Sequence, residues 1–425
     1  MEKSLKKGKK VLVISHLAFN DSNNVGKTLY SIFYDYDKEK IIQLFFNPLS
    51  PNVDKCQSSY LITDDEMIKS LCGAKAGSVY TYYKSDGITT KSSYVSKNRK
   101  TTYSLLLRDI LWKFGRVDYP KLFEWIRSYK PDVIFLAPGY SSFLYRITLK
   151  ISRKLNIPIV TFLMDDFYNE KKNDSFIERI RSSWIRKSIK KTIESSSKVY
   201  ACSQEMADDY GRMLGKQVAV LYTPIINIEQ SPDKWKPTKV KNYIFAGNLN
   251  LNRHKILYNI GSYLAEKYPD VRLYVYTTLE YKNALDILST LNNFVYGGFV
   301  SAEVLKEKIA ESDVVLHVES FDATSAQMTR YSVSTKVPEC MMSGKIFFAV
   351  GPKHQSGINY LRENKCAIVS TSIVEMYANL DLIQSDDFNY QGVYDNAKKM
   401  LEINHSCASC CNRLQSAFDS VCMGD

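Results

Sequence analysis

Ser334, Thr335, Lys336 and Glu339 bring two hydroxyls, a cation and a carboxylate to the start of a predicted short helix. The free N–H groups of a helix start, with hydroxyls and a lysine beside them, favour a phosphate-bearing ligand. Glu339 follows Lys336 by three residues, so both side chains extend from one side of the helix. The lysine can contact a diphosphate while the carboxylate accepts hydrogen bonds from a ribose diol. This spacing predicts a nucleotide site, and an ordinary loop before a helix is the competing interpretation.

A second group of polar residues follows two apolar runs that we predict to be strands. Glu319 comes directly after one run, and Gly247 comes directly after the other. A glycine at such a point lets the backbone approach a ligand closely. Arg253 and Lys255 then bring positive charge to the start of the next helix, where it can neutralise a departing diphosphate. The alternative for these two cations is a solvated helix start.

The first half of the chain contributes two further candidate positions. Asp165 and Asp166 follow the apolar run Pro158–Leu163, so they lie at the carboxyl end of a predicted strand and could polarise a hydroxyl group. A helix cap is the alternative for them. Gly26 follows the first predicted strand in a segment similar to a P-loop, but Asp21 stands where a P-loop needs glycine. We therefore interpret Gly26 as a position of close backbone approach.

The second half resembles the GT-B glycosyltransferases, specifically the large retaining family (family 4-like) that builds bacterial polysaccharides. That family commonly has two glutamates seven residues apart, then a small-residue helix and a Gly-Lys/Arg-Pro turn. This chain has the second glutamate, Glu339, and the Gly344-Lys345 turn, whereas Tyr331 stands where the first glutamate is expected. Glu319 is our substitute for that missing carboxylate. The resemblance covers most of residues 130–365.

The resemblance implies a role for each candidate residue. Arg253, with Lys255 and Lys336, would hold the diphosphate of a nucleotide-sugar donor, and Glu339 would hold its ribose. Gly298 would belong to the loop beside the nucleobase. Asp165, Asp166 or Glu319 would contact the reacting sugar. Gly26 would lie beside the donor phosphate and the acceptor. Such enzymes need no metal or other cofactor.

The elements that must position these residues alternate between short apolar runs and longer amphipathic ones, which indicates an α/β fold with parallel strands covered on both faces. With the resemblance, the expected architecture is GT-B, two Rossmann-like domains facing across a cleft. We expect an acceptor-binding domain over 1–226, a linker over 227–239 and a nucleotide-sugar-binding domain over 240–393. A C-terminal helix over 394–425 is expected to cross back to the first domain.

Composition and charge narrow the possible partners. Among 425 residues, 57 are Lys or Arg and 45 are Asp or Glu, a formal net charge of +12 that favours an anionic partner. Nine cysteines without a repeated pair indicate a reduced, cytoplasmic protein, and His405 near Cys407, Cys410 and Cys411 lacks the second half of a zinc site. The predicted helix 176–193 is basic and contains Trp184, which suits either an anionic membrane surface or an ordinary packed helix.

We therefore predict a glycosyltransferase that moves a sugar from a nucleotide diphosphate to a glycan or lipid-linked glycan, with retention, in cell-surface polysaccharide synthesis. It would be cytoplasmic, at the inner face of the membrane if the acceptor is lipid-linked. A nucleotide-sugar epimerase would share the donor pocket without needing a glycan acceptor. A non-catalytic nucleic-acid binder would use the net charge, but the aromatic residues do not interleave with one basic stripe.

Overall fold

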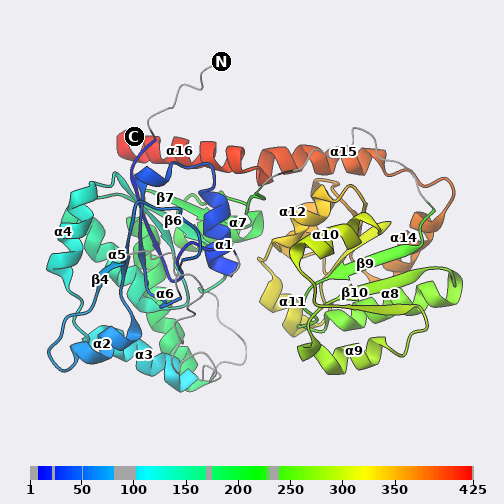
Figure 1. The fold of residues 1–425 in the computed structure, drawn as a ribbon, viewed down its shortest axis with the longest axis horizontal. Helices are drawn as coiled ribbons and strands as arrows, with labels where there is room; N and C mark the ends of the chain where they lie inside the picture. Colours follow the sequence, from blue (N-terminus) through cyan, green and yellow to red (C-terminus); the bar gives the residue numbers. More distant parts are fainter. Residues whose placement is uncertain are drawn as a thin grey trace, which may run out of the picture. The chain divides into compact units, whose positions relative to one another are not determined.

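The computed structural model describes residues 8–21, 24–49, 51–80, 102–168, 175–226, 228 and 239–423. The chain divides into two compact units (Figure 1). The first unit contains residues 1–224 and 407–425, and the second contains residues 225–406. The expected linker over 227–239 lies outside the described residues except for residues 228 and 239.

The first unit is built on one eight-stranded sheet with the order β4-β3-β2-β1-β5-β6-β7-β8, in which only β4 runs antiparallel to its neighbour. Its strands are β1 (Val11–Ser15), β2 (Ile41–Phe45), β3 (Ser58–Leu61), β4 (Ser78–Tyr80), β5 (Val133–Ala137), β6 (Ile159–Leu163), β7 (Lys198–Ala201) and β8 (Ala219–Val220). Every residue of β1, β2, β5 and β6 is buried, which explains why their sequences are apolar except for Ser15, Gln43 and Thr161.

The helices of the first unit connect these strands and cover the sheet. They are α1 (Asn24–Ile32), α2 (Asp64–Ser70), α3 (Thr102–Phe114), α4 (Tyr119–Tyr129), α5 (Ser142–Leu155), α6 (Phe176–Ser195), α7 (Gln204–Leu214) and α16 (Cys407–Met423). Helices α3 and α4 are separate, because Asp118 begins α4 by accepting a hydrogen bond from the backbone N–H of Lys121.

The basic helix 176–193 is a packed part of the first unit. Arg181, one of the six basic residues of this helix, is 1% exposed. Its Nε lies 2.7 Å from Asp109 Oδ2 on α3, and its guanidinium also donates to the carbonyl of Tyr140. The other five basic residues of this segment, Arg179, Arg186, Lys187, Lys190 and Lys191, keep at least part of their surface exposed. Helix α6 therefore has one buried ion pair and a basic outer side.

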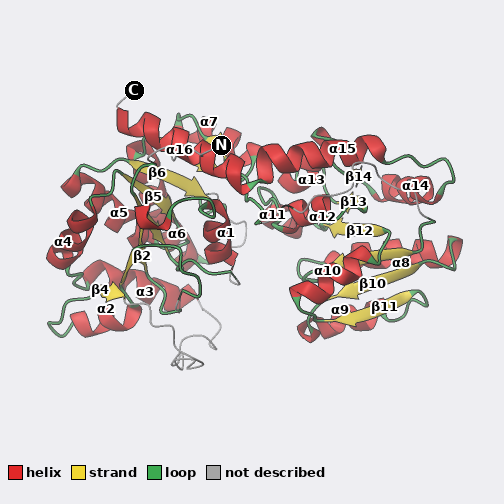
Figure 2. Cartoon of the chain, turned by 45° about the horizontal axis from the view of Figure 1, so that its top comes forward, coloured by secondary structure: helices red, strands yellow, loops and turns green. Residues whose placement is uncertain are grey.

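The second unit has a six-stranded parallel sheet with the order β11-β10-β9-β12-β13-β14. Its strands are β9 (Asn242–Ala246), β10 (Arg272–Tyr276), β11 (Phe294–Gly298), β12 (Val314–Val318), β13 (Ile346–Val350) and β14 (Ile368–Ser370). Figure 2 shows these strands with helices on both sides. In a doubly wound sheet of this order the chain reverses direction between β9 and β12, and ligands bind at the carboxyl ends of the strands beside that point.

The helices of the second unit pack against this sheet. They are α8 (Arg253–Lys267), α9 (Lys282–Leu288), α10 (Ala302–Ala310), α11 (Ala323–Thr329), α12 (Lys336–Met342), α13 (Ser356–Glu363), α14 (Ile373–Gln384) and α15 (Gln391–Met400). Together with the first unit, this arrangement gives two Rossmann-like α/β halves, the architecture predicted from the sequence.

The C-terminal segment contains two helices where the sequence suggested one over 394–425. Helix α15 belongs to the second unit, and a π-helical turn, Leu401–His405, separates it from α16. Helix α16 belongs to the first unit and contributes Cys410, Cys411, Leu414 and Phe418 to its core. Figure 1 draws α16 in red beside α1, and the two helices are in contact.

Two properties of the described residues bear on membranes and metals. No helix in this part of the chain is both long and apolar enough to cross a membrane. The same residues contain no group of three or more His, Cys, Asp or Glu side chains arranged to hold a metal ion. His405 Nε2 instead lies 3.1 Å from the hydroxyl of Tyr360, and Cys410 and Cys411 are buried among apolar side chains.

Candidate active site

A pocket lies where β9 and β12 separate in the second unit. These two strands pair only through Val314 with Tyr243 and Val315 with Ile244, so their carboxyl ends are left apart. The cavity volume is about 100 Å³. Ligand pockets usually measure about 300–1,000 Å³, so this cavity has room for only part of a nucleotide. The polar residues that line the pocket are Asn248, Arg253, His317, Glu319, Ser334, Lys336 and Glu339.

Arg253 and Glu319 form an ion pair across this pocket. Nη2 of Arg253 lies 3.0 and 2.9 Å from the two carboxylate oxygens of Glu319. Nη1 donates a hydrogen bond to Asn248 Oδ1 at 2.6 Å. Glu319 is 2% exposed. Burial raises the pKa of its carboxyl, and the charge of Arg253 opposes that effect. The pair thus fixes the guanidinium at the carboxyl end of β12, immediately beside the start of α8.

Lys336 reaches the end of β9 from the start of α12. Its Nζ donates to the carbonyl of Ala246 at 2.6 Å. A Cβ atom at Gly247 would lie 2.6 Å from that Nζ, so the absence of a side chain at Gly247 allows the ammonium to approach. The hydroxyl of Ser334 accepts a hydrogen bond from the backbone N–H of Lys336 at 3.3 Å and holds the start of α12.

His317 lies in the middle of this site, although the sequence analysis gave it no role. It belongs to the buried strand β12, and its Nε2 is 3.7 Å from Glu319 Oε1 without a hydrogen-bond partner in the described part of the chain. Burial, together with the charges of Arg253 and Lys336, lowers its pKa to about 3. The imidazole is therefore neutral at physiological pH. A lone polar residue inside an otherwise apolar strand is the sequence signal that could have identified it.

The low pKa of His317 predicts a specific loss of stability in acid. Below pH 6.5 the imidazole of His317 becomes protonated in the unfolded chain, whereas in the folded chain it stays neutral down to about pH 3. The free energy of unfolding therefore falls as the pH falls through this window. The expected contribution is about 1.4 kcal/mol per pH unit. Urea unfolding at pH 7.5 and 5.5 should show a smaller loss in His317→Gln than in the wild type. His354→Gln, at an exposed histidine, should retain the wild-type loss, and equal losses in all three proteins would contradict the prediction.

The remaining candidates of the second unit lie at different distances from the pocket. Glu339 lines it from α12 and is exposed, whereas Thr335 begins that helix without a side-chain cap bond and does not line the pocket. Lys255 is exposed on α8 and lies outside the lining. Gly298 is the last residue of the edge strand β11 and has a φ of 77°, and it does not line the pocket either. The structure therefore brings Arg253, Glu319, Ser334, Lys336 and Glu339 together with Gly247, and leaves out the other three.

Asp165 and Asp166 follow β6 in the first unit and differ in their surroundings. The carboxylate of Asp166 accepts hydrogen bonds from the hydroxyl of the buried Tyr210 at 2.8 Å and from the backbone N–H of Tyr168 at 3.3 Å. Asp165 is exposed, and its carboxylate accepts a hydrogen bond from the backbone N–H of Asp166. Asp166 therefore orders the loop after β6, and Asp165 is the more accessible of the two.

Gly26 is required by the packing of the loop that follows β1. A Cβ atom there would lie 1.9 Å from Asn20 Nδ2 and 2.5 Å from the carbonyl oxygen of Ala18. The amide of Asn20 itself donates to that carbonyl at 3.1 Å. The close approach inferred from the sequence is thus an approach of this chain's own loop to helix α1.

Gly26→Ala is expected to destabilise the protein by about 1–3 kcal/mol, the usual cost of inserting a methyl group where no space exists. Gly392→Ala is the matched control, because no atom lies within 4 Å of the added methyl on α15. Alanine in that helix should be neutral or raise stability by up to about 1 kcal/mol. Chemical denaturation of both variants gives the comparison, and an unchanged unfolding free energy for Gly26→Ala would show that the loop moves aside easily.

These features define a class of protein. The two Rossmann-like halves are those of the GT-B fold, as predicted, and residues 88–226 match the family model described as Glycosyltransferase Family 4. The matched segment is about a third of the chain. The protein is accordingly a glycosyltransferase with the GT-B fold.

Solved structures of the same fold cover nearly the whole chain. The Anabaena protein Alr3699/HepE in complex with UDP aligns with a TM-score of 0.64 and 13% identity, over 97% of this chain and 100% of its own. Sucrose-phosphate synthase from Thermosynechococcus elongatus aligns with a TM-score of 0.62 and 9% identity, over 98% and 100%. The lipopolysaccharide outer core galactosyltransferase WaaB aligns with a TM-score of 0.59 and 13% identity, over 96% and 99%. No curated protein matches the sequence.

Proposed function

We propose that this glycosyltransferase takes a sugar from a nucleoside diphosphate sugar and transfers it to a glycan or lipid-linked glycan, with retention of configuration, in cell-surface polysaccharide synthesis. The observation that carries the proposal is the group of Arg253, Lys336 and Glu339 around one pocket at the carboxyl ends of β9 and β12. Support for the donor class comes from similar structures solved with UDP and with UDP-glucose. A lipid-linked acceptor would be met at the inner face of the membrane.

Each residue of the pocket has a chemical task in this proposal. Lys336 and Arg253 stabilise the negative charge that develops on the diphosphate as its bond to the sugar breaks. Glu339 accepts hydrogen bonds from the ribose hydroxyls. Glu319 keeps Arg253 in place, which is a positioning role and replaces the direct sugar contact suggested by the sequence. His317 is neutral, so it offers a hydrogen bond without adding charge.

The first unit supplies the acceptor side of the proposal. Asp165, at the carboxyl end of β6, is accessible to an acceptor hydroxyl and can polarise it. The Asp166–Tyr210 hydrogen bond fixes the backbone that presents Asp165. Gly26 contributes by shaping the loop after β1. No step of the proposed reaction needs a metal or another cofactor.

A thermal-shift panel tests the donor site directly. UDP, GDP, ADP and CDP are each added to the protein, with the matching monophosphates as controls for the diphosphate contact. A ligand present at 100 times its Kd stabilises the native state by about 2.7 kcal/mol. We expect one diphosphate, UDP or GDP, to raise the melting temperature by about 5–10 °C and its monophosphate to do much less. If no nucleoside diphosphate shifts the melting temperature at millimolar concentration, the proposed donor site is wrong.

A further inference from the structure

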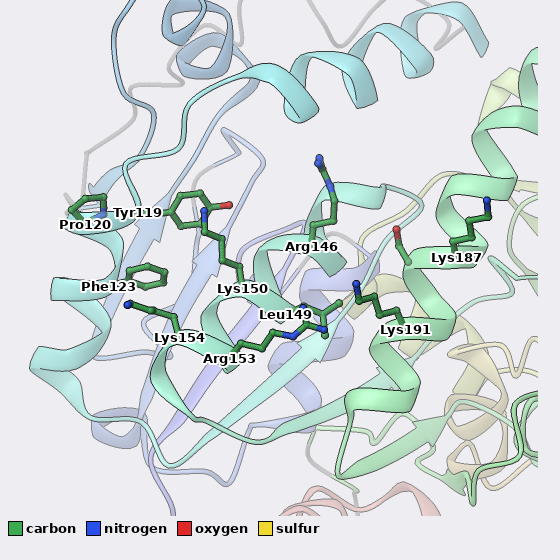
Figure 3. Close-up of a pocket in the computed structure, with 11 residues that line it drawn as sticks. Tyr119, Pro120, Phe123, Arg146, Leu149, Lys150, Arg153, Lys154, Lys187 and Lys191 are labelled. Atoms are coloured by element: carbon green, nitrogen blue, oxygen red, sulfur yellow. The ribbon is translucent and has the colours of Figure 1, made fainter.

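A second and larger cavity lies in the first unit, on the outer side of three helices (Figure 3). It has a volume of about 1,050 Å³, at the upper end of the range for ligand pockets. Helices α4, α5 and α6 form its walls. The residues that line it are Tyr119, Pro120, Phe123, Arg146, Leu149, Lys150, Arg153, Lys154, Lys187, Ser188 and Lys191. We call this cavity the basic groove.

Charge of one sign dominates the basic groove. Six of its lining residues are cations, all with exposed side chains, and no carboxylate is among the described residues that line it. None of the six cations forms an ion pair within the part of the chain that the structure describes. Figure 3 shows them on both sides of the groove, on α5 and on α6. Six like charges around one concavity create a positive potential that attracts an anionic ligand.

The floor of the groove is apolar and fixed. Phe123 and Leu149 are 8% and 6% exposed, and they pack below the cations. Lys150 Nζ lies 3.3 Å from the centre of the Tyr119 ring, which holds that ammonium over the groove. Arg146 is held by a hydrogen bond to the carbonyl of Trp112 at 3.1 Å. Two of the cations are therefore positioned before any ligand arrives.

The shape of the basic groove and its apolar floor indicate which kind of polyanion it can bind. Single-stranded nucleic acid needs open aromatic faces for base stacking. Here the Tyr119 face is covered by Lys150, and Phe123 is buried. A membrane-docking face presents large apolar side chains, but no large exposed apolar residue lines the groove. A concave surface with recessed apolar contacts and several cations suits a chain of sugar rings that carries carboxylates or phosphates.

The groove is remote from the edge of the sheet where the reaction is expected. Helix α5 begins at Ser142, shortly after the carboxyl end of β5, and its groove residues lie further along, from Arg146 to Lys154. Ligands in such folds react at the carboxyl ends of the strands. We propose that the basic groove binds an anionic glycan chain, a part of the acceptor distant from the sugar that reacts. This inference rests on the proposed transfer to a glycan.

Binding of a fluorescent oligogalacturonate to the full chain tests the groove. Neutral dextran of the same length, an oligonucleotide and phosphatidylglycerol vesicles are the comparison ligands. The groove variant combines Lys150→Gln, Arg153→Gln and Lys187→Gln. The control variant combines Lys121→Gln, Arg179→Gln and Lys190→Gln, which remove the same charge from exposed positions on α4 and α6 outside the groove. UDP binding is measured for all three proteins.

We expect oligogalacturonate binding that weakens with salt, about tenfold weaker in the groove variant and within about twofold of wild type in the control. UDP binding should be equal in the three proteins. Equal losses in both variants, tight binding of neutral dextran, or groove-dependent binding of only the oligonucleotide or the vesicles would each overturn the inference. If the wild type bound no nucleoside diphosphate in the thermal-shift panel, the proposed function would instead be contradicted, so the two failures are distinguishable.

Discussion

Lys336→Gln is expected to lower kcat/KM for the nucleotide sugar by roughly 100- to 1,000-fold, the usual effect of removing one charged donor from a developing anion. Glutamine is uncharged and one atom shorter than lysine, so it weakens the 2.6 Å contact with the carbonyl of Ala246 but leaves the apolar part of the side chain largely in place, and the fold should persist. The measurement is the release of the nucleoside diphosphate that gives the largest thermal shift. The same variant should lose most of that shift.

Lys282→Ala is the matched control for this experiment. Lys282 is exposed at the start of α9 in the same unit and does not line the pocket. Its replacement should leave both the turnover and the thermal shift unchanged. A Lys336→Gln enzyme with wild-type turnover would mean that the diphosphate is neutralised elsewhere, and the pocket between β9 and β12 would lose its assigned role.

Arg253→Met is expected to damage both stability and activity, for separable reasons. The substitution removes the guanidinium that lies 2.9–3.0 Å from the carboxylate oxygens of Glu319. Glu319 is 2% exposed, so its carboxylate would remain buried without a cation. Removing one partner of a buried ion pair typically costs about 3–5 kcal/mol. Activity should fall about 100-fold or more, because a cation facing the diphosphate is lost. Unfolding free energy and kcat/KM are measured on the same preparations.

The double variant Arg253→Met/Glu319→Met separates the two effects. Two apolar side chains of similar size often replace a buried pair with little loss, so stability should largely return. Activity should not return, since the positive charge is still missing. If the double variant recovers activity together with stability, Arg253 is structural and has no part in holding the donor.

Most strands inside each sheet could be predicted from the sequence, whereas the edge strands β4 and β11 could not. A parallel strand covered on both faces is a nearly continuous apolar run, as β1, β5 and β6 are apart from Ser15 and Thr161. Strand β4 lies at the edge, and its short sequence Ser-Val-Tyr is mostly exposed. Strand β11 is also an edge strand and ends in two glycines. Neither sequence contains the continuous apolar run from which we predicted the other strands.

The site could be predicted where its residues are neighbours in sequence. Ser334, Lys336 and Glu339 lie within one short segment, and the structure brings all three to the pocket. Arg253 and Glu319 are 66 positions apart, and their pairing arises only when β9 and β12 become neighbours in the sheet. Spacing along a chain contains no information about such a contact. The neutral state of His317 has the same origin, since burial and two distant cations produce it.

The packing of α16 into the core of the first unit has a consequence for synthesis on the ribosome. Phe418 contacts the rings of Tyr36 and Phe135, so this part of the core stays incomplete in the nascent chain until a segment nearly 300 residues further along has been translated. The 182 residues from 225 to 406 are made in between, which takes roughly 10–40 s at ordinary elongation rates. The second unit can close its own core first. A transcript that ends before Cys407 should yield a chain whose amino-terminal half aggregates or recruits chaperones.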